Sequence, residues 1–197
     1  MRLRSVPRSL PGRAPRRRST AARRAQRALR SLALERTLAA FDPRPASTLG
    51  TGLETPFSDL DVACHTACAE AFLLASRKHF EARPGFELGP NELPTWCRFR
   101  APGGVQVELY AAAQDSGDQN AVLHSVAHRL LLAAFGVELR AAVRRRKLLG
   151  MATEPAFAEA LGLVGDPYAV LLEVGRRKSI TPALAQRRTR RKNRRKT

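Results

Sequence analysis

Cysteine, tryptophan, tyrosine and long apolar runs are scarce in this 197-residue chain. Its three cysteines, Cys64, Cys68 and Cys97, are too few for a disulfide framework, and the pair around His65 matches no common zinc ligand set. We therefore expect small thiols in the core. No apolar run approaches the roughly 18 residues of a membrane span, and no apolar stretch follows the N-terminal arginines as in a secretory signal. No membrane partner is expected.

Acidic residues are absent from both ends of the chain. Residues 1–30 contain eleven arginines and residues 176–197 contain eleven lysines or arginines, whereas residues 31–175 contain 13 basic and all 17 acidic residues. The formal charge of +18 is therefore a property of the two ends. Because these ends have little apolar surface to bury, we expect mostly disordered basic tails at 1–30 and 176–197 around one domain at 31–175.

The composition of the tails predicts a partner. Mobile arginine and lysine side chains attract polyanions by releasing counterions and without reading sequence, so non-specific nucleic acid or another polyanion is the expected ligand. The alternatives are that the tails only aid solubility or contact other acidic surfaces. An arginine-rich, acid-free start also resembles an organellar transit peptide, but the abundance of Ala, Arg and Pro favours a GC-rich bacterial genome and hence a cytoplasmic location.

Two carboxylates one residue apart, Asp59 and Asp61, are the strongest functional signal in the chain. The apolar residues around Asp61 predict a short strand, and side chains two apart on a strand point to the same face. Two acids on one face repel each other, which a protein interior rarely tolerates without a cation or a proton. A third acid, Glu108, lies in a later strand pattern of alternating apolar residues. The alternative is that Ser58 and Asp59 form an ordinary turn and that the paired acids occur by chance.

A loop of small residues precedes the acids. Gly50 and Gly52, with Thr51 between them, would let a phosphate approach backbone N–H groups closely, and Ser58 adds a hydroxyl just before the first acid. We therefore predict that Gly50, Thr51, Gly52 and Ser58 bind the phosphates of a nucleotide.

Hydrophobic periodicity and turn residues predict an α+β fold, with a sheet first and a compact helical subdomain after Gly117. The expected strands lie at 46–49, 59–63, 86–88, 96–100 and 105–111. The expected helices lie at 20–41, 67–80, 119–136 and 138–149, followed by two shorter helices that begin at Thr153 and after Asp166.

Several of these stretches resemble a known family. Gly50-Thr51, a spacer, Ser58-Asp59-Leu60-Asp61 and a later strand acid are similar to the nucleotidyltransferase superfamily typified by DNA polymerase beta. Within it, the chain resembles a bacterial nucleotidyltransferase-like family of unknown function (domain of unknown function 4269), most specifically in three segments, Thr153–Ala158, Leu161–Leu163 and Gly165–Tyr168. The resemblance covers roughly Leu34 to Val174. It implies a mixed sheet with flanking helices, a C-terminal helical subdomain and an acid triad, but it supplies no established activity.

The resemblance leads to a hypothesis about chemistry. Asp59, Asp61 and Glu108 would hold two Mg²⁺ ions that bridge the phosphates of a nucleoside triphosphate, and the nucleotidyl group would pass to the hydroxyl of an unknown acceptor. Glu108 would also help to deprotonate that hydroxyl. The alternative is a non-catalytic nucleotide- or nucleic-acid-binding module whose basic tails make the main contact.

Two other features are interpreted as structural. His124 and His128 stand four apart on one predicted helix, but the position after His124 is Ser125 rather than the Glu of a zinc protease, so a structural or exposed pair is expected. The family named above tends to have more charged residues on this helix, which leaves His124 and Arg129 as its polar candidates. The segment 153–168 is rich in caps, helix stops and apolar anchors, and we expect it to be structural as well.

Overall fold

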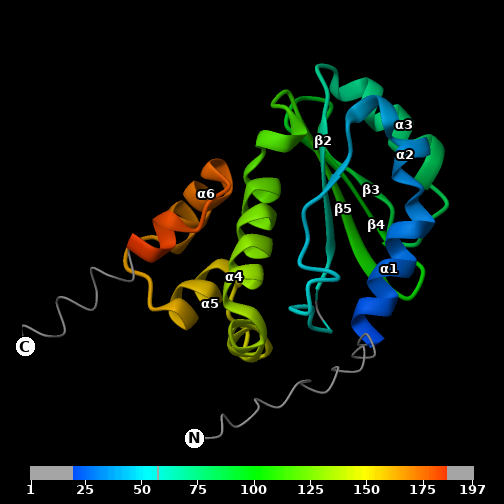
Figure 1. The fold of residues 1–197 in the computed structure, drawn as a ribbon. Helices are drawn as coiled ribbons and strands as arrows, with labels where there is room; N and C mark the ends of the chain where they lie inside the picture. Colours follow the sequence, from blue (N-terminus) through cyan, green and yellow to red (C-terminus); the bar gives the residue numbers. More distant parts are fainter. Residues whose placement is uncertain (1–19, 57, 186–197) are drawn as a thin grey trace, which may run out of the picture.

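The computed structural model describes residues 20–56 and 58–185, and the tail residues 1–19 and 186–197 lie outside the described residues (Figure 1). The first part of the fold is a five-stranded sheet with the strand order β1–β2–β5–β4–β3. Strand β2 runs parallel to β5, whereas the other neighbouring strands are antiparallel, so the expected mixed sheet is confirmed. The strands are β1 (Arg44–Pro45), β2 (Leu60–His65), β3 (Glu87–Leu88), β4 (Thr95–Ala101) and β5 (Val105–Ala112).

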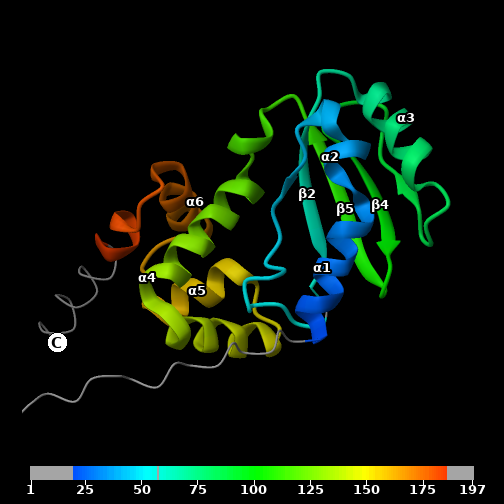
Figure 2. The ribbon, with the colours of Figure 1, turned by 45° about the vertical axis from the view of Figure 1, so that its right-hand side comes forward.

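Helices α1 (Thr20–Leu32) and α3 (Ala69–Phe80) cover one face of the sheet (Figures 1 and 2). Because successive side chains on a strand point to opposite faces, every second strand residue contributes to this covered face. The other face carries the polar residues between them, and the long helix α4 lies on that side (Figure 1). The core under α1 and α3 contains the fully buried side chains of Leu32, Leu60, Phe72, Phe99, Val107 and Leu109.

The helix expected at 20–41 is interrupted. It ends as α1 at Leu32, because Ala33 has a left-handed backbone with φ of 45°. The chain continues as two short helices, α2 (Leu34–Thr37) and η1 (Ala39–Phe41). Ala28 of α1 is fully buried in the core on the covered face of the sheet.

The prediction of a strand at 46–49 is wrong. Strand β1 ends at Pro45, and the chain then turns at Thr48, whose carbonyl oxygen accepts the N–H of Thr51 at 3.2 Å. Residues 46–49 therefore form part of a loop. At the other end of the described chain, Ala183 is buried, so with α1 the described fold extends beyond residues 31 and 175 on both sides.

The second part of the chain is helical and consists of α4 (Asn120–Leu148), α5 (Thr153–Leu161) and α6 (Pro167–Arg177). Helix α4 is kinked at Gly136, whose φ of 66° and ψ of −148° are not helical, which confirms the predicted break at this glycine. Gly175 packs α6 tightly on α4, since a Cβ there would lie 2.1 Å from the carbonyl oxygen of Leu123. A second core joins the three helices and contains Leu131, Phe157, Leu171 and Val174.

Among the described helices, α4 is long and apolar enough to cross a membrane if length and composition alone are considered. Nine of its residues are buried within the fold, where they pack on α5, α6 and the neighbouring part of the sheet. Its apolar composition is therefore explained by its position as the central helix of the second core.

Candidate active site

The three predicted acids meet at the start of β2. Asp59 immediately precedes the strand, Asp61 is its second residue, and Glu108 is the partner of Asp61 in the parallel neighbour β5. Burial and, to a smaller degree, the charges of Asp59 and Glu108 raise the pKa of Asp61 to about 7. The structure therefore brings Asp59 and Glu108 within electrostatic reach of Asp61.

An arginine from the other neighbouring strand holds Glu108. Arg98 Nε donates a hydrogen bond of 2.6 Å to Glu108 Oε2, and its guanidinium lies 4.2 Å from the centre of the Trp96 ring. Across residues 20–56 and 58–185, no group of three or more His, Cys, Asp or Glu side chains is arranged to hold a metal ion. Asp59 and Asp61 still fit Mg²⁺, because this ion usually binds through one or two carboxylates together with the phosphates of a substrate.

A cavity of about 460 Å³ lies between the acid end of the sheet and the helices α4 and α5. We call it the acid cavity. On the sheet side its lining includes Ser58, Asp59 and Asp61, which are consecutive or nearly consecutive in the sequence. On the helical side its lining comes from residues far apart in the sequence, namely His124, His128, Lys147 and Glu154.

Glu108 lines a different cavity of about 340 Å³, which we call the second cavity. Asp61 lines both cavities and therefore lies between them. Tyr110 and Gln119 also line the second cavity, and the Gln119 side chain is fixed by donating a hydrogen bond of 2.8 Å to the carbonyl oxygen of Cys64. The three predicted acids thus line two neighbouring cavities rather than one.

Lys147 brings a positive charge to the helical side of the acid cavity. Its Nζ donates a hydrogen bond of 3.0 Å to Thr48 Oγ1, and both residues line the cavity. Burial lowers the pKa of Lys147 because the charged ammonium loses hydration there. Sequence reasoning did not connect Lys147, near the end of α4, with the acids.

A carboxylate and two imidazoles lie next to Lys147. Glu154 Oε1 is 3.5 Å from His124 Nδ1 and 3.4 Å from His128 Nε2, and burial lowers the pKa of His128. The prediction of a structural segment at 153–168 holds for the fully buried Phe157, but Glu154 faces the cavity. Two signals could have found this group: the spacing of the histidines on one helix face and the most specific segment of the family resemblance, which begins at Thr153.

The small-residue loop packs against α4. The described lining of the acid cavity includes Ser58 but not Gly50, Thr51 or Gly52. Arg140 of α4 donates a hydrogen bond of 2.9 Å to the carbonyl oxygen of Thr51, and the N–H of Gly52 donates to Glu54 Oε2 at 2.9 Å. Gly50 and Gly52 have φ of 84° and 85°, so they serve the turn itself. The hydroxyls of Ser47 and Thr48, which the sequence did not single out, line the cavity instead.

Comparisons with known proteins agree with this architecture. A family model described as a domain of unknown function, DUF4269, matches residues 27–174, and no curated protein matches the chain. A solved structure described as "structure of GLD-2/RNP-8 complex" superposes with a TM-score of 0.51 at 14% sequence identity. The match covers 71% of this chain and 57% of the other. It confirms the expected fold, a mixed sheet followed by a helical region.

Proposed function

The chain belongs to the DUF4269 family, and we propose that it is a Mg²⁺-dependent nucleotidyltransferase that acts on a nucleoside triphosphate and a hydroxyl acceptor. The observation that carries this proposal is the environment of Asp61. This carboxylate is partly buried beside the charges of Asp59 and Glu108, and its pKa is raised to about 7. Such a cluster opposes folding, whereas it favours a bound cation, and strongly shifted pKa values are typical of functional sites.

Asp59 and Asp61 would hold the metal ion. Their oxygen atoms are the ligands that Mg²⁺ prefers, and the remaining ligands would be water and the phosphates of the nucleotide. When bound, Mg²⁺ neutralises charge on the phosphates and stabilises in-line displacement at the α-phosphate. Because two carboxylates make a weak site alone, Mg²⁺ and nucleotide should bind together more tightly than either does separately.

The other residues of the acid cavity suit the triphosphate. Lys147 supplies a positive charge, and Thr48 and Ser58 supply hydroxyl groups that can donate to phosphate oxygens. Thr48 Oγ1 accepts its hydrogen bond from Lys147, so its own proton remains to be donated to a phosphate. We infer that these residues take over the role that the sequence suggested for Gly50, Thr51 and Gly52.

The second cavity would receive the acceptor. Asp61 lies between the two cavities, so an acceptor hydroxyl in the second cavity would lie near the metal-binding carboxylates. The oxygen of this hydroxyl forms the new bond to the α-phosphorus, the bond from that phosphorus to the bridging oxygen breaks, and pyrophosphate leaves. Glu108 would accept the hydroxyl proton once its contact with Arg98 loosens.

One observation favours a rival function. Glu108 is ion-paired with Arg98 at 2.6 Å, and a carboxylate that stays in this pair does not bind metal or take a proton. The rival is a protein that binds a nucleotide in the acid cavity without turning it over. It predicts binding of the nucleotide but no formation of pyrophosphate.

Label transfer separates the two functions. The full-length protein is incubated with Mg²⁺ and nucleoside triphosphates labelled at the α-phosphate, with an RNA oligonucleotide, polyols and the protein itself as acceptors. The proposal predicts label in a product that depends on Mg²⁺ and is lost in Asp59→Asn and Asp61→Asn. Asp42→Asn removes an exposed acid of the same type and is the matched control. Binding of the nucleotide without any labelled product would favour the rival.

A further inference from the structure

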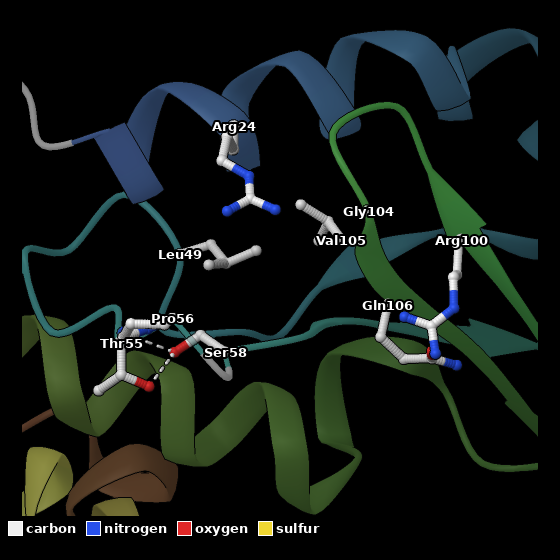
Figure 3. A pocket seen from close by; sticks show the side chains of 9 residues that line it. All are labelled: Arg24, Leu49, Thr55, Pro56, Ser58, Arg100, Gly104, Val105 and Gln106. Carbon is white, nitrogen blue, oxygen red and sulfur yellow. Dashed lines mark hydrogen bonds between the residues drawn. The ribbon is translucent and has the colours of Figure 1, made fainter.

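A third cavity of about 250 Å³ opens where α1, the β4–β5 turn and the loop before β2 meet (Figure 3). Its polar lining includes two arginines, Arg24 and Arg100, and the amide of Gln106, and none of its described lining residues is acidic. We call it the arginine cavity. Two positive charges that line one small space without an acid indicate an anionic ligand.

Arg98 and Arg100 occupy equivalent positions on β4, but only Arg98 has an acidic partner on β5. On β4 and β5, Arg98 pairs in register with Glu108, and Arg100 pairs with Gln106 two residues further along the same face. Arg98 therefore has an acidic partner, whereas Arg100 faces a neutral amide. Among the described residues, no carboxylate forms an ion pair with Arg100.

Arg24 reaches the cavity from the opposite side. Its Nε donates a hydrogen bond of 2.9 Å to the carbonyl oxygen of Gly103 in the β4–β5 turn, and one terminal nitrogen donates to the same oxygen. This contact fixes the guanidinium over the turn, and Figure 3 shows it pointing toward the space beside Leu49 and Val105. The remaining N–H groups of a fixed guanidinium suit the oxygens of a phosphate.

The arginine cavity adjoins the acid cavity. Thr55 and Ser58 line both of them, and Ser58 is the residue before Asp59. The Ser58 hydroxyl oxygen accepts the backbone N–H of Thr55 at 2.9 Å, which fixes the wall that the two cavities share. A ligand held by Arg24 and Arg100 would therefore lie next to the candidate active site.

We propose that the arginine cavity binds a backbone phosphate of a single-stranded nucleic acid, and that this strand is the acceptor. Only the second claim, that the strand is the acceptor, rests on the proposed function. A strand is favoured over a small phosphorylated molecule because basic residues continue beyond the cavity. Arg23, Arg27 and Arg30 are exposed on α1, and neither this helix nor the chain before it contains an acid. Such a basic stripe along a helix is typical of nucleic-acid binding.

The test measures binding of a fluorescent oligouridylate to the full-length protein and its variants across a salt series. Arg100→Gln and Arg24→Gln should each weaken binding about tenfold, as expected when charge-assisted hydrogen bonds to a phosphate are lost. The log–log salt slope should become smaller by about 0.7 for each arginine removed. Arg100→Lys keeps the charge but not the planar fork, so it should restore the slope without the full affinity.

Arg77→Gln is the matched control, because it removes one exposed arginine from α3 that does not line the arginine cavity. The inference is overturned if all the arginine variants bind like Arg77→Gln, or if they lose binding of glucose 6-phosphate but not of the oligonucleotide. Because binding is measured without nucleotide, its outcome is independent of turnover. If turnover occurs, Arg100→Gln should also raise the KM for an RNA acceptor and leave the KM for the nucleotide unchanged.

Discussion

The two walls of the acid cavity carry opposite chemistry. The sheet side presents Asp59 and Asp61, whereas the helical side presents Lys147 and two imidazoles around Glu154. A cation would be attracted to the first wall, and the ammonium group of Lys147 would attract phosphate groups to the second. The comparison suggests that a metal-bound triphosphate lies across the cavity, with the metal toward the sheet and the phosphate tail toward α4.

The largest expected effect comes from the sheet wall. Asp61→Asn should lower the rate of nucleotidyl transfer by at least about 10³-fold, because metal stabilisation of the transition state contributes several kcal/mol. Without metal, its thermal stability should be preserved or raised, because one of three clustered carboxylates is removed. Steady-state kinetics and thermal melts in EDTA check both parts. Strong destabilisation of both Asp59→Asn and Asp61→Asn would indicate a structural role instead.

The helical wall should lose stability when the buried aromatic ring that supports it is removed. Phe157 is fully buried, and its ring stacks on His128 with a centroid distance of 4.8 Å. Phe157→Ala should therefore reduce the free energy of unfolding by about 3–5 kcal/mol, as for other buried aromatic side chains. Urea denaturation measures this loss. A Phe157→Ala protein of unchanged stability that has lost its activity would contradict the structural role of this ring.

Lys147 should affect nucleotide binding more than the metal site. Lys147→Met should weaken nucleoside triphosphate binding about tenfold, since a charge-assisted hydrogen bond to phosphate is lost. Isothermal titration calorimetry in the presence of Mg²⁺ measures the change. Lys78→Met removes an exposed lysine from α3 and serves as the control. Equal affinities for the two variants would remove Lys147 from the proposed site.

The two walls should also differ in the sign of their pH dependence. The folded-state pKa of Asp61 is raised from 3.8 to about 7, so its contribution to stability is lost as the pH rises through this interval. The pKa of His128 is lowered from 6.5, so its contribution is lost as the pH falls below that value. Differences in Tm between wild type and Asp61→Asn should therefore grow with rising pH, and those for His128→Asn with falling pH. Parallel pH profiles for the two variants would contradict this assignment.

The tails should have the smallest effect on turnover. A chain of residues 20–185 retains α1 and the buried Ala183, but it lacks residues 1–19 and 186–197, which contain 15 of the 22 basic residues of the two ends. It should keep the turnover of the full-length protein and lose most of its non-specific affinity for duplex DNA. If about six phosphates are engaged, the full-length protein should show a log–log salt slope near −5. Fluorescence anisotropy across a salt series measures this slope, and equal DNA affinity of the two proteins would refute a binding role for the tails.

The sheet wall could be predicted from sequence because strand geometry constrains it locally. Once Asp61 and Glu108 are placed in strands with alternating apolar residues, their side chains must leave the core on the same face. The helical wall could not be predicted, since Lys147 and Glu154 meet only through the packing of α4 on α5. The turn at Thr48 was also missed, and after it the carbonyl oxygen of Thr51 accepts a hydrogen bond from Arg140. Local periodicity determines which face of a strand or helix a side chain occupies. Contacts between helices depend on how the whole second core packs.

The most direct test of the proposed chemistry is ³¹P NMR of the full-length protein with a nucleoside triphosphate, Mg²⁺ and an RNA oligonucleotide. Nucleotidyl transfer at Asp59 and Asp61 predicts pyrophosphate and a new phosphodiester resonance in equal amounts, and neither should form with Asp61→Asn. Release of orthophosphate would place the cleavage at the γ-phosphate and contradict the account. So would an unchanged spectrum from a folded protein that is shown to bind the nucleotide.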